Sequence, residues 1–193
     1  GVQTCALPIS PLYTGPFVLG PRTGTRNDFS SIPTTPGGPV PSTEVFKGWV
    51  VRARAFKTNA LPSAESVRSF WIDAKGRSRY TLPVVSLVAD RGDFFSVDRG
   101  IYVYGNIGNY NQRGTDWERP VYFELFDTNN APLLSQGASA KIHGNTSQGF
   151  PIKGLGLDAT SGGGTKPFRG RLFPDRTRTE FEHLLLQIGR AHV

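Results

Sequence analysis

The sequence predicts a mainly β chain of the α+β class. Short runs of β-branched and aromatic residues recur along it, and several alternate apolar and polar residues with the two-residue period of a strand. The 193 residues include 23 glycines and 15 prolines, and many of these lie between the runs as turn signals. With aromatic residues at 11%, the composition is typical of a β-rich globular chain and not of a disordered one.

The first part of the chain predicts two strands after a long loop. Residues 20–42 are rich in proline, glycine, serine and threonine and lack periodicity, which favours a loop. Residues 49–56 alternate small apolar residues with arginine, and residues 66–72 alternate in the same way. We therefore expect two strands, each with one face in a core. The polar, glycine-containing stretch 73–79 is the best domain boundary in the chain.

The second part predicts a series of strands separated by polar turns. Residues 82–89 form a nearly continuous apolar run, which indicates a buried strand. A turn is expected at 90–93, and loops are expected at 105–114 and from residue 158 to residue 178. Residues 179–186 begin like a capped helix or a strand. The further strands are expected at residues 100–104, 119–127, 138–143 and 151–157, with 138–143 as the hairpin partner of 119–127.

The two ends of the chain have a DNA-level relationship that proteins have no physical reason to show. Residues 4–9 (TCALPI) can be encoded by a string whose reverse complement, in another frame, encodes residues 188–193 (IGRAHV). A linker ligated to both ends of a DNA fragment explains this. We therefore interpret residues 1–9 and 188–193 as linker-derived and exclude them from fold reasoning. The natural segment is then expected to run from Ser10 to Gln187 and to be truncated at both ends.

Charge and cysteine content limit the function classes. The formal net charge is +7, but the basic residues are mostly dispersed, and the densest region is 166–178. We favour a solvated basic face or a phosphate-facing loop there and expect no nucleic-acid partner. The only cysteine, Cys5, lies in the linker-derived part, which excludes thiolate catalysis, zinc–thiolate sites and disulfides elsewhere. No apolar stretch approaches the length of a membrane span.

Residues 13–72 carry motifs of one known domain family. They include YTGP near the start, VVRARAF in the middle and LPSAESVRSFWI at the end. This stretch resembles the chitobiase/β-hexosaminidase C-terminal-like domain, an immunoglobulin-like accessory module of secreted bacterial proteins. The resemblance implies a β-sandwich over residues 10–75.

A second and longer resemblance covers residues 80–187, which are similar to the N-terminal part of the CotH family of atypical kinases. It implies the β-rich N-terminal portion of a kinase-like lobe. It also implies a parent protein, extracellular or on the bacterial cell surface, that transfers phosphate from ATP, with Mg²⁺, to serine or threonine of a coat or surface protein. In the family the metal-binding carboxylates lie beyond this stretch, so we expect this chain itself to be inactive. The matching motifs are LPVVSLVAD (82–90), DFFSVDRGIYV (93–103), NYNQRGTDWERPVYFELFD (109–127), GASAKIHGNTSQGFPIKGLGL (137–157) and LFPD (172–175).

The candidate cofactor-binding residues are a loop and the lysine after it. Glycines between two strands allow close backbone approach to a phosphate, and hydroxyls and amides can donate to it; a plain hairpin turn explains the same residues. Lys153 follows on the strand expected at 151–157, where the family usually has a lysine, and we assign it to the nucleotide phosphate; a solvated lysine is the alternative. The chain lacks the family's cation near 147–150. The loop residues are Gly144, Asn145, Thr146 and Ser147.

The remaining polar residues are expected to be structural. We interpret His143 as a hydrogen-bonded structural histidine, Glu118 and Arg119 as a structural clasp, and Glu124 as a surface residue; catalytic roles are the alternatives for the first three. Trp117 is interpreted as a packing residue of the 119–127 strand, with a place in the wall of the site as its alternative. The sequence contains no Gly-x-Ser-x-Gly elbow and no paired histidine motif, so hydrolase chemistry has no support. The alternative function is a non-catalytic cell-surface module that binds carbohydrate or cell wall.

Overall fold

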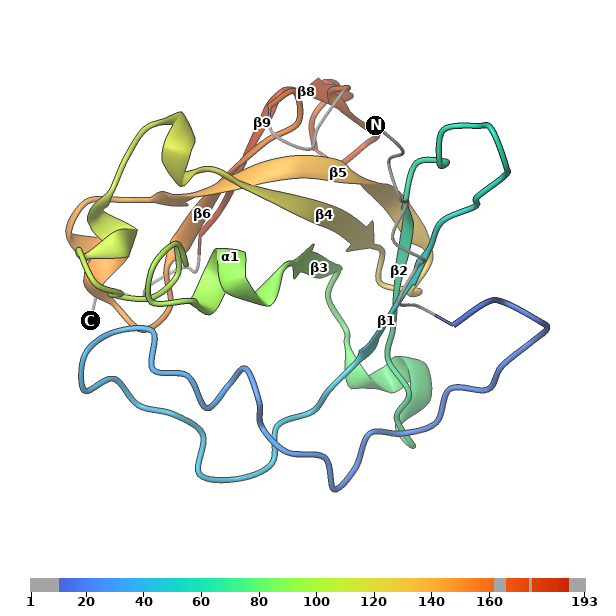
Figure 1. The fold of residues 1–193 in the computed structure, drawn as a ribbon, viewed down its shortest axis with the longest axis horizontal. Coiled ribbons are helices and arrows are strands. Elements are labelled where there is room, and N and C mark those ends of the chain that lie inside the picture. The colour runs from blue at the N-terminus through green and yellow to red at the C-terminus, as the bar shows by residue number, and fades with distance from the viewer. Residues whose placement is uncertain (1–10, 162–165, 174, 188–193) are drawn as a thin grey trace.

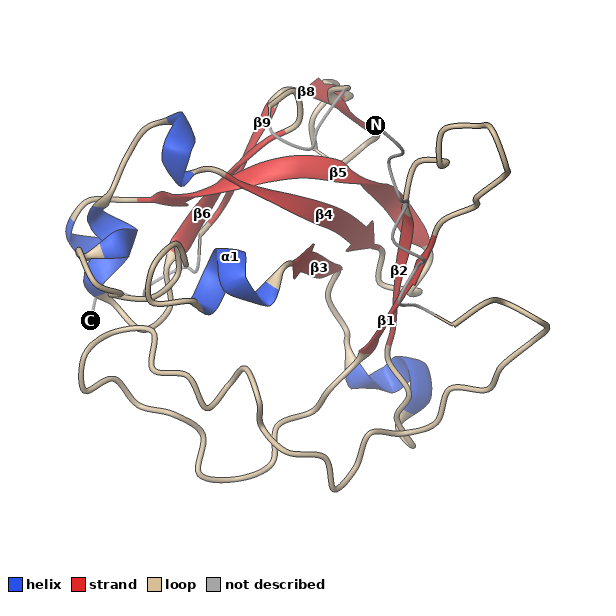
Figure 2. Ribbon diagram, viewed as in Figure 1, coloured by secondary structure: helices blue, strands red, loops and turns tan. Residues whose placement is uncertain are grey.

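The computed structural model describes residues 11–161, 166–173 and 175–187. The predicted linker-derived segments, 1–9 and 188–193, lie outside these ranges. The described chain is mainly β, with one short α-helix and four 3₁₀ turns (Figure 2). The predicted mainly β class is confirmed.

The central element is a five-stranded antiparallel sheet in the order β3-β4-β5-β6-β9 (Figure 1). Neighbours from β3 to β6 are consecutive in sequence, but only β4 and β5 are joined by a tight turn, since residues 90–118, with α1, η2 and η3, separate β3 from β4. A bulge interrupts the register of β4 and β5 between Leu125 and Phe126. The five strands are β3 (Val84–Ala89), β4 (Arg119–Phe126), β5 (Pro132–His143), β6 (Gly154–Asp158) and β9 (His183–Leu186).

Short elements fill the connections between these strands. The side chain of Asp90 caps α1 by accepting from the backbone N–H of Gly92 at 2.7 Å, as expected for an N-cap aspartate. The other short elements are α1 (Arg91–Phe95), η1 (Gly76–Arg79), η2 (Asn109–Asn111), η3 (Thr115–Trp117), η4 (Thr146–Gly149), and the paired strands β7 (Phe168–Arg169) and β8 (Glu180–Phe181).

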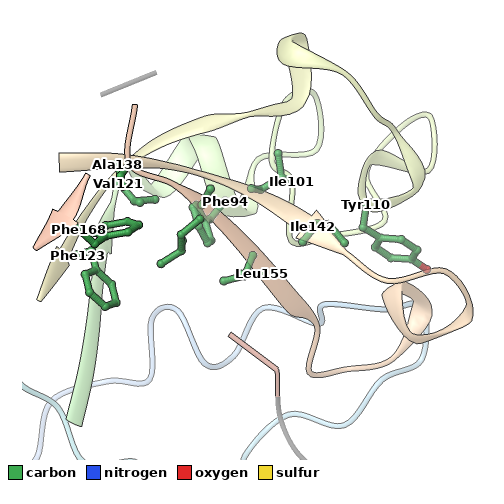
Figure 3. Packing of buried hydrophobic residues seen from close by; sticks show 12 residues of the cluster. Phe94, Ile101, Tyr110, Val121, Phe123, Ala138, Ile142, Leu155 and Phe168 are labelled. Carbon is green, nitrogen blue, oxygen red and sulfur yellow. The ribbon is translucent and has the colours of Figure 1, made fainter. Parts of the chain in front are cut away.

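The hydrophobic core lies between one face of the main sheet and the segment that contains α1 and η2 (Figure 3). Every second residue of a strand contributes its side chain to this core, because successive side chains of a strand point to opposite faces of the sheet. Tyr110 of η2 closes one end of this core, next to Ile142. The sheet contributes Val121, Phe123, Ala138, Ala140, Ile142, Leu155 and Leu157, and Phe94, Ile101, Tyr110, Ala159 and Phe168 complete the cluster.

Two predicted elements around α1 are different in the structure. Residues 90–93 were expected to form a turn, but α1 begins at Arg91. Residues 100–104 were expected to form a strand and instead form turns. The backbone N–H of Ile101 donates to Asp93 at 2.9 Å, and that of Tyr102 donates to Phe94 at the same distance. These local bonds to α1 use the donors that a strand would offer to a neighbour.

The N-terminal segment contains one two-stranded antiparallel sheet, of β1 (Trp49–Ala53) and β2 (Ser66–Phe70), as predicted for these two runs. The rest of 11–75 is loop, turn and bend. The immunoglobulin-like sandwich expected over 10–75 stays a prediction. The loop before β1 passes below α1 in Figure 1, and the ring of Phe29 lies 5.7 Å from that of Phe95.

β2 packs against the main sheet through a buried carboxylate. Glu124, expected at the surface, is fully buried. Its Oε2 accepts from the backbone N–H of Ser69 at 2.8 Å, and its Oε1 lies 3.3 Å from Nη1 of Arg68. The hydroxyls of Ser69 and Ser86 also share a hydrogen bond of 2.8 Å. Ser86 lies on β3, directly opposite Glu124 in the strand register. The surface prediction was wrong because β2 covers the face of β4 that strand alternation alone assigns to solvent.

Candidate functional site

Lys153 is a buried lysine directly before β6. Only 3% of its surface is exposed, although two of its neighbours, Pro151 and Ile152, are partly or largely accessible. Its Nζ donates to the carbonyl of Phe150 at 2.7 Å. Its backbone N–H donates to the hydroxyl of Tyr102 at 3.0 Å. The ammonium therefore closes the turn that leads into β6.

Two tyrosine rings line the ammonium of Lys153. Nζ lies 4.0 Å from the ring centroid of Tyr110 and 5.7 Å from that of Tyr102. The negative ring faces attract a cation at these distances, but they do not neutralise it. Among the described residues, no carboxylate forms a salt bridge with Lys153. The site is thus a desolvated positive charge without an anionic partner in the described chain.

Burial lowers the pKa of Lys153 from 10.5 to about 8. The cause is desolvation, which disfavours the charged form of an amine. The group is still mostly protonated at neutral pH, yet its proton is held less tightly than that of a surface lysine. An anion placed against Nζ would reverse this effect, since an opposite charge at close range favours the protonated amine.

The loop of residues 144–149 precedes Lys153 and requires a glycine at its start. Gly144 has φ +118°, a conformation that side chains with a Cβ rarely adopt. A Cβ there would also collide with the hydroxyl of Ser147. η4 follows, with backbone bonds from Gln148 to Asn145 at 3.2 Å and from Phe150 to Ser147 at 3.2 Å. The loop is therefore a compact turn whose end, Phe150, contacts Lys153.

Arg113 links this loop to the tyrosine that lines Lys153. Its Nη2 donates to the carbonyl of Gly144 at 3.0 Å and to Oε1 of Gln148. Its Nη1 donates to the carbonyl of Tyr110 at 3.2 Å. This guanidinium supplies a positive charge to the loop from a distant segment. The NYNQRG stretch gives no local signal of this contact, because the partners are 31 and 35 residues away.

The structure joins the predicted site residues only in part. Lys153 was expected on a strand over 151–157, but β6 begins at Gly154, and burial excludes a solvated Lys153. Gly144 and Ser147 are half-buried, and the hydroxyl of Ser147 lies where a Cβ on residue 144 would be. Asn145 and Thr146 are exposed. Tyr102, Tyr110 and Arg113 complete the arrangement. Sequence reasoning did not select the two tyrosines, because nothing in their local pattern distinguishes them from core residues.

Glu118 forms the centre of a polar cluster on the same sheet. Its carboxylate accepts from Lys141 at 2.8 Å, from Ser161 at 2.6 Å and from Ser139 at 3.1 Å. The hydrogen bond from Lys141, followed by that from Ser161, holds the pKa of Glu118 below its usual value. Arg119 donates to the carbonyl of Arg99 at 2.9 Å. These contacts agree with the predicted structural clasp.

The two remaining candidates also have defined positions. Trp117 packs against the core, as predicted, and Arg119 lies over its ring at 5.4 Å. His143 was expected to be a hydrogen-bonded structural histidine. It is instead exposed at the end of β5, where its backbone pairs with that of Gly154.

Within residues 11–161, 166–173 and 175–187, no group of three or more His, Cys, Asp or Glu side chains could hold a metal ion. Within the same ranges, none of the helices has the length and apolar character needed to cross a bilayer.

No protein-family model, curated protein or solved structure matches the chain. The family resemblances therefore rest on the sequence motifs alone.

Proposed function

We propose that residues 80–187 are the N-terminal part of a CotH-type kinase-like domain, whose parent protein transfers phosphate from ATP to serine or threonine of a coat or surface protein. The observation that carries the proposal is Lys153, a buried ammonium without a described carboxylate partner beside a glycine-containing loop. A kinase positions nucleotide phosphates with such a loop and lysine. A five-stranded antiparallel sheet that carries both is compatible with a kinase-like N-terminal lobe.

The residues at this site fit a phosphate group. An ammonium has three donors, and one of them has the Phe150 carbonyl as its partner. Arg113 adds positive charge at the same loop, where it donates to the carbonyl of Gly144. Because Lys153 is only 3% exposed, a phosphate reaches Nζ only if the segment 144–150 shifts and the Phe150 carbonyl is displaced. Nucleotide binding is therefore expected to be coupled to movement of this loop.

The described residues do not fit Mg²⁺, since they provide no cluster of carboxylates for it. Mg²⁺ remains a cofactor of the proposed parent protein by resemblance, and no step through it is derived for this chain. We expect the 193-residue chain to bind ATP without transferring its phosphate. Phosphoryl transfer from ATP by the isolated chain would contradict this expectation.

The proposal also covers the N-terminal residues and the location of the parent protein. We assign residues 10–75 to a chitobiase/β-hexosaminidase C-terminal-like module, with support from the antiparallel pair β1–β2 and the quoted motifs. The combination of this module with a CotH-like segment implies an extracellular or cell-surface location for the parent.

The test is calorimetric titration of the full chain with ATP, in buffers with and without Mg²⁺. The variant Lys153→Met removes the charge but keeps the length and apolar stem of the side chain, and it should reduce ATP affinity by about tenfold or more, the loss of one charged hydrogen bond. Lys57→Met, at an exposed loop lysine, is the matched control and should leave the affinity unchanged.

Two results would reject the assignment of Lys153. One is the same ATP affinity in the chain and in Lys153→Met, with both folded by circular dichroism. The other is no ATP binding at millimolar nucleotide, which would favour a non-catalytic surface module.

A further inference from the structure

A second site lies away from Lys153, where the N-terminal two-stranded sheet meets the main sheet. It is a pocket of about 510 Å³. Its walls come from β2 and the residues after it, from η1, and from the turn between β4 and β5. The volume lies within the ~300–1,000 Å³ range of small-molecule sites. None of its lining residues takes part in the Lys153 site.

Aromatic side chains form the apolar part of this pocket. Trp71 and Phe126 pack edge to face with ring centroids 5.0 Å apart, and Trp71 and Tyr80 do the same at 6.4 Å. Phe70 adds a further ring to the lining and is 38% exposed. The rings come from three chain segments, so the folded structure builds this wall and no local motif does.

One arginine in the lining has a buried nitrogen without a hydrogen-bond partner in the described chain. It is Nε of Arg79, whereas the buried Nη1 of Arg68 lies 3.3 Å from Oε1 of Glu124. Buried donors are nearly always satisfied in folded proteins, so an unsatisfied donor beside a pocket favours a ligand that brings an acceptor. The guanidinium of Arg79 is also held over the ring of Phe46, 3.4 Å from its centroid, which fixes the direction of its donors.

The charges around the pocket cancel. Arg68 pairs with Glu124 at 3.3 Å, and Arg79 pairs with Asp73, which itself lines the pocket. An anion would be attracted by the guanidiniums and repelled by the carboxylates at similar range. A ligand with hydroxyl groups meets no such conflict, because a hydroxyl accepts from an arginine and donates to an aspartate.

We propose that this pocket binds an uncharged saccharide. The apolar C–H face of the sugar ring packs on the aromatic wall around Trp71. Its hydroxyls accept from Arg79 and from the amide of Asn130, and they donate to Asp73. The proposal goes beyond the kinase assignment and does not depend on it.

The test titrates the full chain with chitotetraose, cellotetraose and mannotetraose as neutral probes, and with glucuronic acid as an anionic one. Binding is followed by calorimetry and by tryptophan fluorescence, since Trp71 lies in the wall. We expect at least one neutral probe to bind and to change the fluorescence. We also expect the same affinity in Lys153→Met, which separates this proposal from the nucleotide site.

Two variants test the residues of the pocket. Arg79→Lys keeps the charge that faces Asp73 but removes the Nε donor, and Asn130→Gly removes the amide while tolerating the φ of +61° found there. Each should weaken binding, Arg79→Lys by about tenfold, the loss of one charge-assisted hydrogen bond. Arg169→Lys is the control, because Arg169 forms an exposed pair with Glu180. Thermal unfolding of each variant shows that it is folded.

Three outcomes would overturn the proposal. The first is no binding of any neutral probe at millimolar concentration. The second is binding of glucuronic acid alone with a strong dependence on salt, which would indicate an anion site. The third is saccharide binding that neither Arg79→Lys nor Asn130→Gly changes, which would locate the sugar elsewhere.

Discussion

The ammonium of Lys153 lies 4.0 Å from the ring centroid of Tyr110, and no described carboxylate forms a salt bridge with it. The two residues are brought together by the packing of η2 against the loop before β6. A buried charge of this kind costs free energy unless a partner neutralises it. Lys153 is therefore expected to destabilise the free chain and to become favourable when an anion binds.

The first prediction concerns the pH dependence of stability. Folding lowers the pKa of Lys153 from 10.5 to about 8, so between these values the unfolded chain holds a proton that the folded chain has released. The free energy of unfolding should therefore rise with pH across this window, by up to about 3 kcal/mol from this group. Below pH 8 Lys153 is protonated in both the folded and the unfolded chain. The full free-energy cost of burying its charge then opposes folding.

Urea unfolding of the chain and of Lys153→Met between pH 7 and 10.5 measures this contribution. The difference between the two curves isolates the contribution of Lys153, because all other side chains are the same in both proteins. At pH 7 the methionine variant should be the more stable one. Parallel curves over the whole range would show that Lys153 is solvated, and Lys57→Met should give such parallel curves.

The second prediction concerns the contact between β2 and the main sheet. Glu124→Ala should destabilise the chain by about 3 kcal/mol or more, because it removes the acceptor of the Ser69 N–H and leaves the Arg68 guanidinium without its anion. Glu180→Ala, in an exposed pair with Arg169, should change stability by less than about 1 kcal/mol. Equal midpoints in urea for the two variants would contradict the buried position of Glu124.

The third prediction concerns the first residue of the loop before Lys153. Gly144→Ala should lower stability by more than about 1 kcal/mol, since alanine is strained at φ +118° and its Cβ would collide with Ser147. Gly149→Ala is the matched control in the same loop, because a Cβ there would meet no atom within 4 Å. Thermal unfolding of both variants measures this difference in stability. A Gly144→Ala variant as stable as the control would contradict this loop geometry.

The fourth prediction concerns Arg113 as the link between η2 and the loop. Arg113→Ala should speed amide hydrogen exchange in residues 144–149, because the guanidinium bonds to Gly144 and Gln148 are lost. Exchange in β4 and β5 should stay unchanged. Uniformly faster exchange over the whole sheet would instead indicate global destabilisation, and no change in the loop would show that the clamp does not form in solution.

The residue pattern by itself determined several strands of this protein. Alternation of apolar and polar residues located β1, β2 and β6, and an apolar run located β3, each to within a few residues, because such patterns are local properties of the chain. It failed at 100–104, where local backbone bonds to α1 take the place of a strand pairing. The sequence GIYVY (100–104) shows the same residue pattern whether the segment forms a strand or turns.

Only the tertiary structure decided which side chains are buried and which meet. Glu124 has a polar position in the pattern of β4, yet β2 covers it, and Lys153 is polar yet enclosed by two tyrosines from distant segments. The partners of Arg113 and the walls of the Trp71 pocket likewise come from segments far apart in sequence. Burial depends on what packs across a face, and strand periodicity carries no information about that.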